Sequence, residues 1–471
     1  MQRRGAILSV VAAAAVVGLA ASPAGAGSPV TWGPLEVVDV PTVESVGLDW
    51  TTTPTAQWTS TSKPVVLQGD FNADGRDDVF LYVKGSVADQ LWLGQPFDEA
   101  GGDTDRTGRF AVSTINVSGT YLPFTGDFDG NGATDIFWYA PGTNPDSIWY
   151  FEDGEVEASV PVSVNGTYQP IVADFDQNDG VPSDDIFWYG ERNAESVWSG
   201  RSSQTFQTRT FQTQAPAGAQ VLVGNFAPDE ALAQYRQQTY FPDLFFYVPG
   251  TGVDAQWNSV GNGTFQVVSR TVNGSYRPIV GNFDQGLPGW LGGLSEIFWY
   301  APGTGADTIW INDDGTFVGS KVTVNGRYAP FVVPGTVAAD AIVWNNPTGS
   351  DSVWLPTGTS GEWKYSSRSF PGSDMGDRTP VVGQFDDVYD DYDYLTVFTM
   401  LGLLPTTPGA PLGTAVADPQ VQTIIDEMPR ADVLWLAAGN GSGDSEVYWR
   451  VDGADVTYQQ TEVEQPILAT S

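Results

Sequence analysis

The chain has 471 residues, and its 57 Asp and Glu residues against 20 Lys and Arg give a net charge of −37. This excess of acid argues against binding to nucleic acid or to anionic lipid, because both need a basic protein surface. Aromatic residues make up 13% of the chain and charged residues only 16%. The chain can therefore build a large core, but it has too few charges for the outer faces of a helical bundle, and we expect an all-β protein.

Cysteine and histidine are both absent. Without cysteine there are no disulfides, thiolate metal sites or cysteine nucleophiles. Without histidine the chain lacks the commonest general base, the Ser-His-Asp triad and imidazole-ligated zinc. An enzyme built on this sequence would have to use carboxylates, tyrosine, lysine or a Ser-Lys pair.

The first 26 residues have the pattern of a secretory signal peptide. Two arginines are followed by an apolar run at residues 6–21 and by Ala24-Gly25-Ala26, a small-residue cleavage pattern. We expect cleavage after Ala26 and a mature protein that is secreted or held at the cell surface, where calcium is plentiful. The alternative is a membrane anchor, for which the apolar run is short; we expect no membrane insertion.

Internal repeats begin near residue 63 and return about every 50 residues. The sequence YLPFTGDFD at 121–129 recurs as YQPIVADFD at 168–176 and as YRPIVGNFD at 276–284. A second signature follows each copy, as DIFWY does at 135–139 and EIFWY at 296–300. Weaker copies bring the number to seven. A period of this size predicts an array of supersecondary units rather than three ordinary domains.

Each copy holds four short strand-like runs. In the second copy they cover about residues 121–128, 135–140, 147–152 and 156–164. Turn sequences such as Asp153-Gly154 and Asn165-Gly166 separate them, because two-residue hairpins need positive φ at both central positions. Four antiparallel strands in each of seven copies predict a seven-bladed β-propeller of four-stranded antiparallel blades. Its blades pack face to face, so we expect most of the tryptophans to be core residues.

The two ends of the chain predict how the ring closes. Residues 27–62 precede the first copy, and residues 465–469 resemble the start of an eighth copy that stops at once. We therefore expect the termini to meet and to complete one shared blade of a propeller that spans residues 63–471. The seventh copy carries an insertion at about 395–430, in which Asp418-Pro419 predicts the N-terminus of a short helix.

Acidic loops join the first and second strands of the early copies. Loop one, DFNADGRDD at 70–78, and loop two, DFDGNGATD at 127–135, both fit the pattern D-x-D/N-x-D/N-G-x-x-D. Oxygen-bearing side chains at alternate positions converge if the chain turns sharply at the glycine, and Ca²⁺ takes about six to eight oxygen ligands. The alternative is an acidic, solvated turn. The predicted calcium ligands of these two loops are Asp70, Asn72, Asp74, Asp78, Asp127, Asp129, Asn131 and Asp135.

Loop three is longer than these two and predicts a third calcium site, with Asp174, Asp176, Asn178 and Asp185 as ligands. The corresponding loops of copies four to seven lack the full motif or carry insertions, so we assign no site to them. All these loops lie at one rim of the predicted ring. Trp290, in the enlarged loop of copy five, is either an exposed aromatic platform for a ligand or a plug over the ring.

The repeats resemble the FG-GAP/VCBS family, which occurs in integrin α-subunit heads and in many secreted bacterial proteins. Residues 126–141 and their copies carry this resemblance, which covers about residues 60–468. It implies a β-propeller and calcium at the loops with the matching motif. It implies no particular activity.

Three classes of function are compatible with the sequence. The one that we expect is a monomeric, secreted module that binds glycan, cell-surface polymer or protein through its rim loops or central channel. The alternative is a carboxylate-dependent polysaccharide lyase or glycoside hydrolase, but no pair stands out among 57 acidic residues and we name no catalytic residue. The third class is a purely structural surface protein. A fold alone does not decide between them.

Overall fold

The structure is a computed structural model. It describes residues 65–85, 88–95, 109–176, 183–190, 194–211, 215–228, 241–250, 252–284, 294–303, 307–335, 339–346, 351–357, 363–370, 379–383, 385, 432–436, 447–452 and 455–459. The predicted signal peptide, residues 27–62, Asn178, Trp290, the insertion at about 395–430 and the C-terminal residues 465–469 lie outside the described residues.

The described residues form seven four-stranded antiparallel sheets, each made of four strands that are consecutive in the chain. The first four sheets consist of β1 (Val65–Gly69), β2 (Asp78–Tyr82), β3 (Ala88–Gln95) and β4 (Arg109–Asn116); β5 (Leu122–Gly126), β6 (Asp135–Tyr139), β7 (Asp146–Glu152) and β8 (Glu155–Val162); β9 (Gln169–Ala173), β10 (Asp185–Tyr189), β11 (Ser196–Arg201) and β12 (Thr205–Thr210); and β13 (Gln220–Gly224), β14 (Asp243–Tyr247), β15 (Asp254–Ser259) and β16 (Phe265–Arg270). The other three consist of β17 (Arg277–Gly281), β18 (Glu296–Tyr300), β19 (Asp307–Asp313) and β20 (Thr316–Val322); β21 (Ala329–Val333), β22 (Ala341–Asn345), β23 (Asp351–Pro356) and β24 (Tyr365–Phe370); and β25 (Thr379–Gly383), β26 (Asp432–Leu436), β27 (Val447–Asp452) and β28 (Asp455–Gln459).

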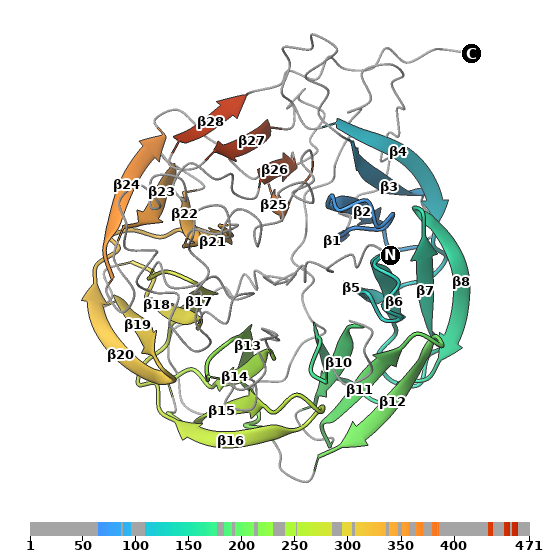
Figure 1. Ribbon diagram of the computed structural model, residues 1–471, viewed down its shortest axis with the longest axis horizontal. Helices are drawn as coiled ribbons and strands as arrows, with labels where there is room; N and C mark the ends of the chain where they lie inside the picture. The colour runs from blue at the N-terminus through green and yellow to red at the C-terminus, as the bar shows by residue number, and fades with distance from the viewer. Residues whose placement is uncertain are drawn as a thin grey trace, which may run out of the picture.

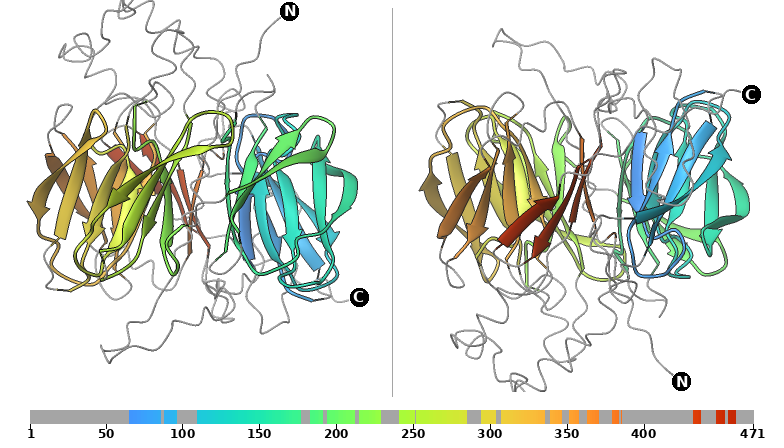
Figure 2. Two further views of the ribbon diagram at one scale, coloured as in Figure 1. Left: turned by 90° about the horizontal axis from the view of Figure 1, so that it is seen from below. Right: turned by 90° about the horizontal axis from the view of Figure 1, so that it is seen from above.

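The sheets stand around a central axis, with the first strand of each sheet innermost and the fourth outermost (Figure 1). Seen from the side, they form one ring whose strands run between its two ends (Figure 2). The chain is therefore an all-β propeller of four-stranded antiparallel blades, as its repeats predicted. Among the described residues there is no helix long and apolar enough to cross a membrane.

In the blades whose burial is described, the second strand forms the core. All five residues are buried in β6, and the same is true of β10 and β18. Alternate side chains of a strand point to opposite faces of a sheet, so the sequence DIFWY can contact the blades on both sides. The outer strand β8 instead alternates between exposed and partly buried residues. A strand between two packed faces must be apolar on both of them, whereas the outermost strand borders solvent.

Tryptophans of the second strands pack edge-on against aromatic rings. The Trp138 ring lies 5.0 Å from the ring of Tyr82 in the preceding blade and 5.1 Å from that of Trp149 in its own. The pair Tyr139 and Trp188 repeats the contact across the next boundary, at 5.2 Å. Such tilted aromatic pairs add to the stabilisation that burial itself provides. The expectation that the tryptophans are mostly core residues is confirmed for four of the second strands, by Trp138, Trp188, Trp299 and Trp344.

Tyrosine hydroxyls link consecutive blades by hydrogen bonds. The Tyr139 hydroxyl donates to the Gly166 carbonyl at 2.9 Å and accepts from the Tyr168 amide at 3.0 Å, at the entry to β9. Tyr82, Tyr247 and Tyr300 make the same two bonds at their own blade boundaries. Each hydroxyl therefore fixes the segment that links one blade to the next.

The ring closes where the first and seventh sheets meet. Trp92 and Phe110 of the first sheet share a hydrophobic cluster with Val381 of β25 and with Phe385, which follows it. The Gln68 side-chain amide also donates to the Val382 carbonyl at 2.5 Å. Each of the described sheets takes all four strands from its own copy, and the terminal segments that we expected to complete a shared blade lie outside the described residues.

Candidate metal centre

Loop two connects β5 to β6 and takes its shape from Asp127. Its carboxylate accepts hydrogen bonds from the amide of Gly130 at 2.7 Å and from that of Gly132 at 2.9 Å. The chain turns back within these few residues, and Gly132 has a φ of 93°, which favours glycine. The two remaining acids of the loop, Asp129 and Asp135, are thereby brought to one side of the turn.

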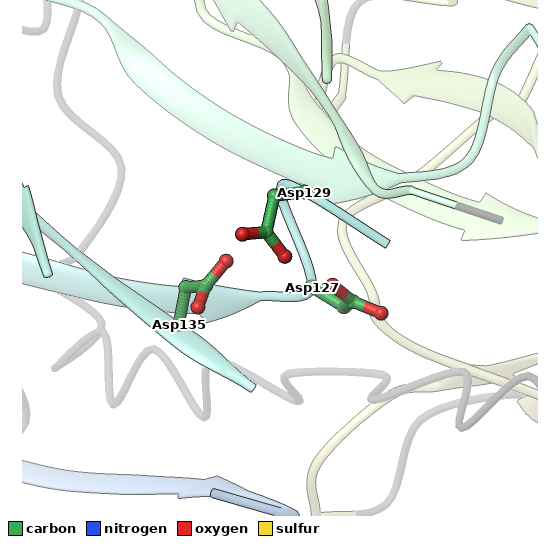
Figure 3. A group of neighbouring side chains, drawn as sticks. All are labelled: Asp127, Asp129 and Asp135. Atoms are coloured by element: carbon green, nitrogen blue, oxygen red, sulfur yellow. The ribbon is translucent and has the colours of Figure 1, made fainter. Parts of the chain in front are cut away.

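The three acids of loop two come together at the end of the second blade. Asp127, Asp129 and Asp135 each offer a carboxylate oxygen, and these oxygens all lie within 4.8 Å of one another (Figure 3). Asp129 is only 6% exposed and Asp135 is fully buried. Burial and the neighbouring carboxylates raise the pKa of Asp127 to about 6 and that of Asp135 well above its ordinary value. A bound cation would offset this cost of placing like charges together.

The neighbouring blade covers loop two. Gln204, in the turn between β11 and β12, donates from its side-chain amide to Asp129 at 3.2 Å and to Glu157 at 3.3 Å. Its backbone has a positive φ of 56°, which is uncommon for a residue other than glycine. Loop two is therefore enclosed by groups from two blades, an arrangement that its own motif did not indicate.

Loop three also gathers its acids. Asp174, Asp176 and Asp185 are all buried, and each offers an oxygen within 4.8 Å of the others. The Arg201 guanidinium lies 2.9 Å from the Asp176 carboxylate, so this loop already has one positive partner. The fourth predicted ligand, Asn178, lies outside the described residues.

Loop one is arranged differently. Among the described residues, only loops two and three bring carboxylate oxygens of three acids within 4.8 Å of one another. Asp70, Asp74 and Asp78 of loop one do not form such a group. The Asp74 carboxylate instead lies 3.0 Å from the Arg76 guanidinium. The Asn72 side chain also donates to Asp74 at 3.1 Å. The motif match is as good as that of loop two, but the arginine next to its glycine provides an internal cation.

The last acid of each loop has a structural role that the sequence analysis missed. Asp135 accepts hydrogen bonds from the amides of Phe128 and Phe151, both at 2.9 Å. Asp78 and Asp185 bind the equivalent two amides. Asp243 does the same in the fourth blade, which lacks the acidic motif, at 2.8 Å to Phe226 and 2.7 Å to Ser259. The persistence of this acid in copies without the motif was the available signal.

A second set of buried acids accepts hydrogen bonds from backbone amides at the end of the blades opposite the acidic loops. Asp146, at the start of β7, accepts from the amides of Ala140 and Val164, both at 2.7 Å. Asp89, Asp254 and Asp307 bind the corresponding pairs of amides in their blades. Because buried backbone amides need acceptors, these acids serve the fold, and their recurrence in the repeat reflects that role.

Asp184 links loop two to loop three. Its carboxylate accepts from the Asp127 amide at 2.9 Å, and its own amide donates to the Asp127 carbonyl at 2.6 Å. The fifth and sixth blades repeat this pair of bonds with Asn282 and Asp340. Burial raises the pKa of Asp184 to about 7. Neighbouring loops are thus connected across the blade boundary.

Comparisons with known proteins do not identify the family of this chain. No protein-family model matches the chain, and no curated protein matches it either. A solved structure of a lectin from Agrocybe aegerita, which specifically recognises non-reducing terminal N-acetylglucosamine, aligns with 66% of this chain and 81% of its own at 13% identity and a TM-score of 0.48. A similarity of this size supports no functional conclusion. The resemblance to the FG-GAP/VCBS family therefore stays a prediction from the motifs.

The raised pKa values predict how the calcium-free protein responds to pH. Burial raises the pKa of Asp70 and Asp127 from 3.8 to about 6 and that of Asp184 to about 7. Between about pH 4 and 7 the folded chain then holds more protons than the unfolded chain, so stability falls as pH rises. Calorimetric melting of calcium-stripped protein should show this decline. Added calcium should flatten it, because a cation favours the ionised carboxylates. A melting temperature that rises across this range without calcium would contradict the prediction.

Proposed function

We propose that this chain is a secreted, calcium-binding, seven-bladed propeller of the FG-GAP/VCBS type that acts as an extracellular binding module. The observation that carries the proposal is that loops two and three each gather three carboxylates, at equivalent positions in neighbouring blades. Calcium would bind to these two groups. Loop one is the weaker candidate, because the Asp74 carboxylate already forms an ion pair with Arg76.

The donor set favours calcium over other divalent ions. Loop two offers carboxylate oxygens and the side-chain oxygen of Asn131, and the whole chain has no cysteine or histidine to attract zinc or copper. Calcium accepts irregular oxygen shells, whereas magnesium demands a compact octahedron and gives up its water reluctantly. A loop that shares its carboxylates with backbone amides suits the larger and more tolerant ion.

The positions of the acids support binding rather than catalysis. A glycosidase needs two carboxyl groups that reach a substrate from opposite sides. Asp135, Asp146 and Asp243 are almost completely buried and hold backbone amides, so a substrate cannot reach them. Within the part of the chain that the structure describes, no exposed pair of carboxylates stands out, and we retain the binding module. An array of glycans and cell-surface polymers, read with calcium and with chelator, tests for the ligand.

Calcium should stabilise the folded chain. An ion that binds the folded loops but hardly the unfolded chain adds about 2.7 kcal/mol per site at a free concentration of about 100 Kd. We expect a higher melting temperature in calcium than in chelator and two bound ions by titration calorimetry, with magnesium as the matched control. If calcium and chelator give the same melting temperature, these loops are acidic turns and the calcium proposal fails.

A further inference from the structure

Tyr150 carries a buried hydroxyl with no protein partner. The residue lies in β7 of the second blade and is fully buried. Among the residues that the structure describes, none forms a hydrogen bond with its hydroxyl oxygen. Buried hydroxyls nearly always find a partner, and one that does not destabilises the folded state. Tyr139 differs in this respect, because its hydroxyl makes two hydrogen bonds that link consecutive blades.

The strand register places Tyr150 against loop two. Ile136 pairs with Trp149 in the ladder between β6 and β7, so the next position along brings Tyr150 opposite Asp135. Residues opposite each other in an antiparallel pair lie on the same face of the sheet. In addition to burial, the carboxylates of Asp135 and Asp129 raise the pKa of the Tyr150 hydroxyl. The register therefore places Tyr150 on the same face of the blade as Asp135, the last acid of the gathered group.

The next residue of β7 also belongs to the wall of this site. The Phe151 amide donates to Asp135 at 2.9 Å, and the Phe151 carbonyl accepts from the Asn131 side chain at 2.8 Å. Loop two is thus held against β7 by the middle and by the last residue of its motif.

The residue type at the position of Tyr150 differs between blades with gathered acids and the first blade, which lacks them. The residue after the third-strand tryptophan is Tyr150 in the second blade and Ser199 in the third, the two blades with gathered carboxylates. It is Leu93 in the first blade, where the acids are not gathered. A hydroxyl thus stands at this position in both blades whose loops can hold an ion, and its presence in the second is not a requirement of the fold.

We propose that the Tyr150 hydroxyl belongs to the oxygen shell of the cation bound at loop two. This inference rests on the proposed function, because it names a further group at the same site. It accounts for a buried hydroxyl without a protein partner beside acids that repel one another. It also adds a neutral oxygen from outside the loop motif, so the motif alone underestimates the site.

The test is the substitution Tyr150→Phe, which removes only the hydroxyl. In chelator the variant should unfold at the same denaturant concentration as the wild type or at a higher one, because an unsatisfied group has been removed. In calcium, titration calorimetry should show one site weakened by about 10- to 100-fold, the usual effect of losing a supporting group at a metal. Tyr150→Leu, which copies the first blade, provides a second variant if the phenylalanine variant folds poorly.

The matched control is Tyr139→Phe in the same blade. It removes a hydroxyl with two partners, so it should lower stability equally with and without calcium and leave calcium affinity unchanged. Wild-type calcium affinity in both Tyr150 variants would overturn the inference while leaving the proposed function intact. A wild-type protein that binds no calcium would instead overturn the proposed function.

Discussion

Replacing Asp135 by alanine is expected to lower the free energy of unfolding by about 2–6 kcal/mol. The substitution leaves the buried amides of Phe128 and Phe151 without their acceptor, and each unsatisfied amide costs about 1–3 kcal/mol. Burial raises the pKa of Asp135, so the variant also gains from removal of a poorly solvated group. We therefore expect the lower half of the range, measured by chemical denaturation at neutral pH in chelator.

Asp243→Ala is the matched variant, because Asp243 holds the equivalent amides in a blade without the acidic motif. Both variants should lose stability in chelator, but only Asp135→Ala should also lose the stabilisation that one calcium ion provides. If Asp243→Ala abolishes a calcium site as well, the ions do not bind at loops two and three. If neither variant is destabilised, the structural role of these acids is wrong.

Asp129→Ala should remove one bound calcium ion and leave the fold of the calcium-free protein nearly unchanged. Asp129 accepts only weak bonds, at 3.2 Å from the Asn131 amide and 3.2 Å from the Gln204 side chain. Its carboxylate is thus the one in loop two least needed by the backbone. Titration calorimetry should count one ion fewer than in the wild type. The lost stabilisation should be about 2.7 kcal/mol at a calcium concentration of about 100 Kd.

Asp153→Asn is the control for the loss of one negative charge from the same blade. Asp153 is exposed and has a positive φ of 51°, which asparagine tolerates. The number of calcium ions bound by the Asp153→Asn variant and its melting temperature should match those of the wild type. An unchanged ion count in Asp129→Ala would mean that loop two is an acidic turn, and the site in loop three would then have to be tested at Asp176.

Much of the fold was predictable because its signals are local and repeated. The second-copy strands expected at about 135–140 and 147–152 were found at Asp135–Tyr139 and Asp146–Glu152. Asp153-Gly154 forms the turn expected before the fourth strand, with positive φ at both residues. Apolar alternation and turn residues act within one blade, so a period of about 50 residues repeats the same evidence.

The sequence was less informative about the site. The motif predicted calcium in loops one and two equally well, and it predicted a third site in the longer loop three. The structure instead groups the acids of loops two and three. The difference in loop one comes from Arg76, whose pairing with Asp74 depends on side-chain conformation.

The sequence by itself determined the class of fold, the unit of repetition and the end of the ring where oxygen-rich loops lie, because these depend on neighbours within one repeat. Tertiary structure alone decided what each acid does. Asp135 meets an amide 16 residues away on the third strand, and Asp184 meets one 57 residues away on the preceding blade. Whether a carboxylate holds the backbone, pairs with an arginine or faces a cation depends on contacts that form only when blades pack, and no single repeat contains them.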